Sequence, residues 1–124
     1  MYRVRGFTMI ELLVVLAVIA MLLSIVAPRY IHQADRAKEA ALKENLSTLR
    51  VAIDQYYGDK GTYPERLEQL VQAHYLRKIP LDPVKNSDSA WSLVLQDEEG
   101  HKVIYDVKST AIGKSLDGSV YSSW

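Results

Sequence analysis

The sequence predicts an α+β chain, in which one long N-terminal helix is followed by a short second helix and a small antiparallel sheet. Three observations predict it. Apolar and helix-forming residues recur at helical spacing through the first half of the chain, and a shorter segment near residue 64 repeats that spacing. Residues 91–107 instead alternate apolar and polar side chains around an acidic turn. Helices segregated from a run of strands are typical of the α+β class.

The first element is an apolar run over residues 7–27, preceded by Arg3 and Arg5. As a helix it would extend about 31 Å, which matches the roughly 30 Å hydrocarbon core of a bilayer. The arginines would hold the N-terminal end in the cytoplasm. A cleaved signal peptide and a buried core helix are the alternatives, but a signal peptide has a shorter apolar run and a small-residue cleavage site after it. We therefore expect a helix that remains in the membrane.

The helix is expected to continue to Tyr57, because residues 34–57 are rich in good helix formers. An apolar stripe at helical spacing predicts the side that packs against the domain core: Leu42, Leu46, Leu49 and Ile53. Gly58 and Gly61 supply the stop. Pro28 removes one helical hydrogen bond, so a kink or local melting is expected there.

A second, short helix is predicted over residues 64–73. Thr62 and Glu65 have the spacing of a capping box, in which a threonine at the start of a helix and a glutamate three residues later satisfy each other's backbone N–H groups. The expected buried side comprises Leu67, Leu70 and Val71.

Two strands follow a proline-containing loop. Residues 91–96 alternate in character and predict the first strand, residues 97–100 (DEEG) predict the turn, and residues 102–107 predict the returning strand. The polar segment after them leads to Tyr121 and Trp124, which we expect to pack back on the domain.

Glu11 is a single carboxylate at the head of the apolar run. A charged side chain at membrane depth costs on the order of 2.5–3.5 kcal/mol on insertion scales, so its position indicates function. Which cation it pairs with decides what that function is.

The sequence GFTMIELL at residues 6–13 closely resembles the type III signal of type IV pilins and pseudopilins. The resemblance implies that an inner-membrane prepilin peptidase cuts after Gly6 and methylates the new N-terminal Phe7. Residues 1–6 would then be a cleaved leader, residues 7–28 the transmembrane helix and filament core, and residues 29–124 a periplasmic pilin-like globular domain. The resemblance also implies that the region of Pro28 unwinds in assembled filaments.

Cleavage would leave a positive amine on Phe7, about one helical turn from Glu11. The resemblance implies that Glu11 pairs with the Phe7 amine of the adjacent subunit and so sets the axial stagger of a helical filament. A pair within one chain, or a carboxylate that simply reaches the lipid headgroups, is the alternative.

The second half resembles the major pseudopilin of type II secretion, the general secretion protein G group. The residues that carry this resemblance lie in order along residues 61–124: Gly61, Tyr63, Pro64, Leu67, Leu70, Tyr75, Leu76, Ile79, Pro80, Asp82, Pro83, Asp117 and Trp124. The W-G-N-P sequence usual in that group is replaced by VKNS at residues 84–87, which indicates a divergent branch. The chain has no cysteine, whereas many type IVa pilins carry a C-terminal disulfide loop.

Members of that group bind calcium in the last loop, so the resemblance implies a structural calcium held by Asp117 with Ser109 and Ser115. Calcium takes six to eight oxygen ligands. The loop offers Asp117 as its one carboxylate, and Lys114 adds an opposing charge. The alternative is a solvated turn built on Asp117 and Gly118.

The chain carries 15 basic and 15 acidic residues, and no basic patch points to a nucleic acid. No catalytic arrangement is evident, so we expect a structural protein and not an enzyme. The resemblance implies a single-pass protein of the bacterial inner membrane that polymerises with itself to drive protein secretion. Its implied partners are the prepilin peptidase, minor pseudopilins, an inner-membrane assembly platform, a cytoplasmic assembly ATPase and an outer-membrane secretin. A type IV pilin for adhesion, motility or DNA uptake, and a membrane-anchored periplasmic domain that never polymerises, are the alternatives.

Overall fold

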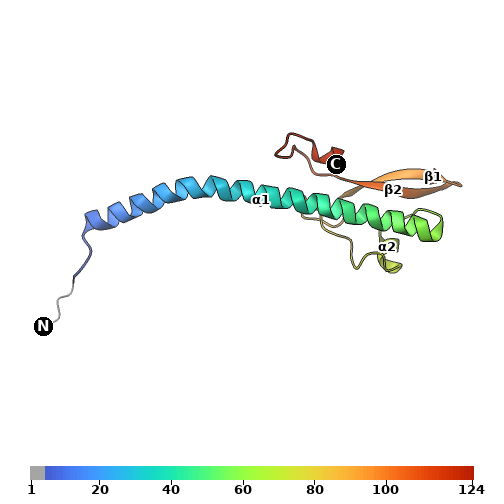
Figure 1. Ribbon diagram of the computed structural model, residues 1–124, viewed down its shortest axis with the longest axis horizontal. Coiled ribbons are helices and arrows are strands. Elements are labelled where there is room, and N and C mark those ends of the chain that lie inside the picture. The colour runs from blue at the N-terminus through green and yellow to red at the C-terminus, as the bar shows by residue number, and fades with distance from the viewer. Residues whose placement is uncertain (1–4) are drawn as a thin grey trace. The chain divides into compact units, whose positions relative to one another are not determined.

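The computed structural model describes residues 5–124; residues 1–4, which include Arg3 and most of the predicted leader, lie outside the described residues. The elements run in the order α1 (Met9–Lys60), α2 (Glu68–Gln72), β1 (Trp91–Glu98), β2 (His101–Ser109) and the 3₁₀ turn η1 (Tyr121–Ser123). The predicted α+β class is confirmed (Figure 1). The chain divides into two units, Met1–Asp35 and Arg36–Trp124, which are described separately.

The first unit contains the apolar part of α1. Its side chains are exposed throughout, and an 18-residue window has a mean hydropathy of 2.9, so the segment is long and apolar enough to cross a membrane. Pro28 lies inside the helix, which continues on both sides of it. The local melting expected at Pro28 is therefore absent from the single chain.

The second unit is organised around the later part of α1. The predicted stripe is its buried face, since Leu42, Leu46, Leu49 and Ile53 are each at most 1% exposed. These side chains join one hydrophobic core with α2 and the strands, to which Leu70, Trp91, Ile104 and Val107 also belong. Figure 1 shows α2 and the β1–β2 hairpin beside this part of α1. The stripe therefore builds the domain, as its spacing predicted.

The ends of α1 differ from the prediction. The helix begins at Met9, two residues after Phe7, and continues through Gly58 to Lys60. Gly61 alone ends it, because its φ of 74° is a left-handed conformation that glycine adopts without strain. Its N–H donates to the Tyr57 carbonyl at 2.8 Å and closes the last turn.

The second helix is shorter than predicted, and the expected capping box between Thr62 and Glu65 is wrong. The Thr62 hydroxyl donates to Glu98 of β1 at 3.2 Å, which takes it away from the helix start. The Gln69 side chain instead holds the segment before α2: its Oε1 accepts the Glu65 N–H at 2.7 Å and the Arg66 N–H at 3.4 Å. Leu67, the residue at the start of α2, makes no side-chain capping bond. The segment before α2 is also held by β2, since the Ile104 N–H donates to the Pro64 carbonyl at 2.7 Å.

The predicted hairpin is present, and both strands are longer than expected. β1 and β2 pair antiparallel with Glu98 opposite His101, which leaves Glu99 and Gly100 as a two-residue loop. Both have positive φ, 52° and 83°, as a type I′ turn requires. Acidic residues 97 and 98, which the sequence placed in the turn, are therefore part of β1.

The C-terminal segment packs back on the domain as predicted. Tyr121 and Trp124 are partly buried against the core, and their rings meet edge to face with centroids 5.2 Å apart. The Arg50 side chain of α1 holds the end of the segment by donating to the Trp124 carbonyl at 2.8 Å.

Candidate functional site

Gly6 and Phe7, the predicted cleavage and methylation residues, lie before the first turn of α1. Neither is in a helix or strand, and the Phe7 side chain is 86% exposed. A Cβ added at Gly6 would have no atom within 4 Å, so packing in this chain does not require glycine there. Gly6 and Phe7 are thus exposed near a chain terminus, outside any helix or strand, where cleavage by proteases is concentrated.

Glu11 and Thr8 form a reciprocal hydrogen-bonded pair at the start of α1. The Glu11 N–H donates to Thr8 Oγ1 at 3.1 Å, and the Thr8 N–H donates to Glu11 Oε2 at a longer 3.4 Å. This is a capping box, which satisfies two backbone N–H groups that the first helical turn leaves open. It was not among the predicted caps, although the pattern T-x-x-E at residues 8–11 is visible in the sequence.

This pair fixes where the Glu11 carboxylate lies. Among the described residues, the only group that donates to it is the Thr8 amide, so a neutral N–H and not a cation faces the charge. A negative side chain is also stabilised at a helix N-terminus. The carboxylate is therefore held at the entrance of the apolar helix with capacity to accept a further donor.

Two of the candidate calcium residues, Asp117 and Ser115, form a knot of hydrogen bonds together with Ser119. Oδ1 of Asp117 accepts the Ser115 hydroxyl, the Ser119 N–H at 2.9 Å and the Ser119 hydroxyl at 2.6 Å. The Ser119 hydroxyl oxygen in turn accepts the Trp124 indole N–H at 2.8 Å. These bonds, the one from Ser115 first, hold the pKa of Asp117 well below its ordinary value, and the charge of Lys43 acts in the same direction.

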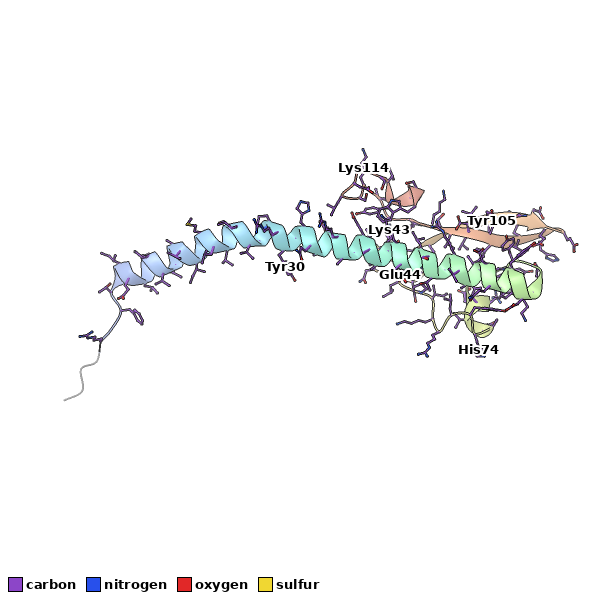
Figure 2. The ribbon with its side chains drawn as sticks, in the orientation of Figure 1. Tyr30, Lys43, Glu44, His74, Tyr105 and Lys114 are labelled. Atoms are coloured by element: carbon purple, nitrogen blue, oxygen red, sulfur yellow. The ribbon has the colours of Figure 1, made fainter. Side chains whose placement is uncertain are left out.

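Side chains of α1 bind this loop from the helix side. Glu39 Oε1 accepts the Leu116 N–H at 2.8 Å and the Tyr121 hydroxyl at 3.0 Å. The Lys43 ammonium lies 4.5 Å from the centre of the Trp124 ring, within the range of a cation–π contact. Figure 2 labels Lys43 on α1 and Lys114 in the loop above it. These contacts fasten the loop to α1 of the same chain.

Ser109 does not join this knot. It donates its hydroxyl to Asp82 Oδ2 at 2.6 Å and accepts the Ala111 N–H at 3.1 Å. The structure therefore brings Ser115 to Asp117, as predicted, and assigns Ser109 to a different carboxylate. Within residues 5–124, no group of three or more His, Cys, Asp or Glu side chains is placed to hold a metal.

The donor set around Asp117 does not fit calcium. The loop supplies one carboxylate, and three hydrogen bonds from the protein itself already converge on its Oδ1. Calcium requires six to eight oxygens, with carboxylates to balance its charge. Lys43 instead brings a positive charge toward the same site.

Asp82 is a buried carboxylate that was not predicted to hold the fold together. It is fully buried, and its Oδ1 accepts the N–H groups of Val84 at 2.9 Å and Lys85 at 3.1 Å. The third bond, from Ser109, connects the proline-containing loop to the end of β2. The D-P dipeptide at residues 82–83 signals such a turn, because aspartate accepts N–H groups two and three residues later.

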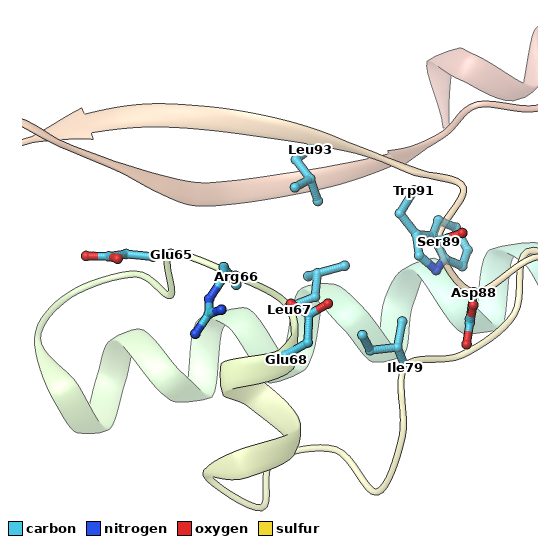
Figure 3. A pocket seen from close by; sticks show the side chains of 9 residues that line it. All are labelled: Glu65, Arg66, Leu67, Glu68, Ile79, Asp88, Ser89, Trp91 and Leu93. Carbon is cyan, nitrogen blue, oxygen red and sulfur yellow. The ribbon is translucent and has the colours of Figure 1, made fainter.

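A groove of about 290 Å³ lies between α2 and β1 (Figure 3). Leu67, Ile79, Trp91 and Leu93 form its apolar lining. Three carboxylates, from Glu65, Glu68 and Asp88, line it together with Arg66. The groove therefore has both apolar and charged walls.

Known proteins are similar to this chain both in its N-terminal motif and over most of its length. The prokaryotic N-terminal methylation motif matches residues 1–27. The type II secretion system core protein G of Escherichia coli is 31% identical over 121 residues, covering 85% of this chain and 79% of that protein. The core protein G of Klebsiella pneumoniae is 28% identical over 133 residues, covering 94% and 93%.

A second kind of relative is similar over a shorter length. The type IV major pilin of Myxococcus xanthus is 38% identical over 63 residues, which is 51% of this chain and 29% of that protein. No solved structure matches. The similarity to core protein G therefore extends over most of the chain, whereas the similarity to the pilin covers about half of it.

These relatives are named as a secretion-system core protein and a major pilin. The apolar helix and the N-terminal methylation motif make this chain a membrane-anchored protein. From the motif at residues 1–27 and the identity over most of its length, the chain belongs to the family of the type II secretion system core protein G, the major pseudopilins.

Proposed function

We propose that this chain is the subunit of a type II secretion pseudopilus, a helical filament of many copies that drives protein secretion. The observation that carries the proposal is the Glu11 carboxylate, held by Thr8 at the head of an exposed apolar helix and, among the described residues, facing no cation of its own chain. A charge kept in that position is costly unless a partner supplies the opposite charge.

Processing supplies that partner. Cleavage between Gly6 and Phe7 by the prepilin peptidase creates a positive amine, and methylation of Phe7 retains its charge. In a filament, the amine of one copy would pair with Glu11 of the next, and contacts of this head-to-tail kind propagate because they do not close. Since lipid is as apolar as leucine, a polar link of this sort is what two apolar helices need in order to associate specifically.

The cellular setting follows from the family. The mature chain would be stored in the bacterial inner membrane as a single-pass protein with its globular domain in the periplasm. An inner-membrane assembly platform and a cytoplasmic ATPase would drive polymerisation, minor pseudopilins would join the filament, and an outer-membrane secretin would receive it. Unwinding near Pro28 would belong to the assembled state, since the helix of the single chain is continuous there.

A type IV pilin used for adhesion, motility or DNA uptake is the second candidate. The identity to the pilin of Myxococcus xanthus supports it over about half of this chain. The greater coverage of the core protein G relatives favours the secretion pseudopilus.

The test compares the wild-type chain with Glu11→Ala and Glu11→Gln in cells that carry the secretion system. We expect both variants to be cleaved after Gly6 and to enter the membrane, but to yield no filaments and no secretion. A signal-anchored domain that never polymerises would instead function normally with either substitution. Normal filaments and normal secretion with Glu11→Ala would overturn the proposal.

A further inference from the structure

We infer that this chain closes its C-terminal loop with a hydrogen-bonded knot around Asp117, which takes the place of a bound calcium ion. A terminal segment stays ordered only when contacts hold it to the domain. Here such contacts keep Tyr121 and Trp124 packed against the core. In this chain, protein groups alone meet that need.

Three hydrogen bonds meet at one oxygen of the Asp117 carboxylate. Oδ1 of Asp117 accepts bonds from the Ser115 hydroxyl and from both the hydroxyl and the amide of Ser119. A calcium ion at this oxygen would have to displace donors that the loop itself provides, and the loop has no second carboxylate to balance the ion's charge. The knot is therefore a competitor of the ion for the same atom.

Ser119 connects the Asp117 carboxylate to the Trp124 side chain. The Ser119 hydroxyl donates to Asp117 and accepts the Trp124 indole N–H at 2.8 Å. Both its hydrogen and its oxygen are therefore used within the knot. Through that bond the turn is connected to the aromatic side chain that packs on the core. A calcium ion usually provides this kind of cross-link between distant loop atoms.

Two side chains of α1 hold the C-terminal segment against the helix. Glu39 binds the loop at Leu116 and Tyr121, and Lys43 lies over the Trp124 ring. The hydrogen bonds from Ser115 and Ser119 lower the pKa of Asp117 most, and the charge of Lys43 acts in the same direction. A helix cation and loop hydroxyls together thus supply the charge and the cross-links.

This inference concerns the loop and stands whether or not the chain polymerises. The test uses the full-length protein in detergent, with the melting temperature measured in a chelator and in calcium at millimolar concentration. Variants are the double substitution Ser115→Ala with Ser119→Ala and, as a matched control on the neighbouring exposed serine, Ser122→Ala. Calorimetric titration with calcium chloride is the second readout.

We expect the wild-type melting temperature to be the same in chelator and in calcium, with no heat of calcium binding. The double variant should melt about 4–8 °C lower, the change typical of a domain of this size that loses on the order of 1 kcal/mol, and Ser122→Ala should not. A rise in the wild-type melting temperature with calcium, or saturable heat, would overturn the inference even if the double variant fails to fold. An unchanged melting temperature for the double variant would also overturn it.

Discussion

Thr8 and Glu11 cap each other: the Glu11 N–H donates to the Thr8 hydroxyl oxygen, and the Thr8 N–H donates to the Glu11 carboxylate. The same carboxylate is the proposed filament contact. Glu11 therefore begins the helix in the single chain and remains able to accept a second donor in the assembly. Thr8, the residue directly after Phe7, thus positions the charged Glu11 carboxylate.

Replacing Thr8 by alanine should reduce filament yield without preventing cleavage. The substitution leaves the Glu11 N–H without its acceptor, and loss of an N-cap threonine costs about 0.5–2 kcal/mol. Thr8→Ser keeps the hydroxyl and is the matched control. The measurement is the amount of filament per amount of processed subunit, and equal yields from the wild type and Thr8→Ala would show that the capping box does not position Glu11.

Asp82→Ala should lower the stability of the globular unit. The substitution removes the acceptor for two backbone N–H groups and the Ser109 hydroxyl at a fully buried site. Leaving such groups unsatisfied costs about 1–3 kcal/mol. Thermal unfolding measures the loss, and Ser109→Ala, which removes one of the three bonds, should cost less. A melting temperature unchanged by Asp82→Ala would contradict this role.

The hairpin loop should respond in opposite directions to two substitutions. Glu99 has a φ of 52°, a conformation that costs an ordinary residue roughly 1–2 kcal/mol and asparagine less. Glu99→Asn should therefore raise the melting temperature. Gly100→Ala should lower it, because Gly100 has a φ of 83°. If both substitutions shifted the melting temperature in the same direction, the type I′ turn would be wrong.

The knot should lose part of its strength in acid. The pKa of Asp117 is lower in the folded chain than its ordinary value of 3.8, chiefly through the Ser115 hydrogen bond. The stability that the charged form contributes is therefore present above pH 3.8 and is lost as the pH falls below it. The difference in melting temperature between the wild type and Asp117→Asn should shrink below that pH, whereas a difference that stays constant would contradict the linkage.

The parts of the fold set by periodicity were predictable. Leu42 to Ile53 formed the core face because four apolar side chains at helical spacing leave few other arrangements. The hairpin was predictable for the same reason, since its alternation is local. What depended on contacts between distant residues was missed: the Thr62 hydroxyl bonds to Glu98 in β1 and does not cap α2.

The candidate sites divide in the same way. Gly6, Phe7 and Glu11 are close together in sequence, so the motif alone was enough to predict their roles, which stay predictions. The C-terminal site depended on which hydroxyl reaches which carboxylate. Ser109 lies closer in sequence to Asp117 than to Asp82, yet β2 carries it to Asp82. Composition could name the oxygens of the loop, but only the fold decides which of them meet.

The most direct test of the proposed filament contact is to determine which chain supplies the amine that meets Glu11. Wild-type and Glu11→Gln chains are expressed together, and their mixed filaments are treated with a zero-length carbodiimide that joins amines to carboxylates. Mass spectrometry then identifies the N-terminal peptides that are joined. If the contact is between subunits, some cross-links should join Glu11 of a wild-type chain to the Phe7 amine of a Glu11→Gln chain. Such a cross-link can form only between two different chains. Coupling of Glu11 solely to the Phe7 amine of its own chain would contradict it.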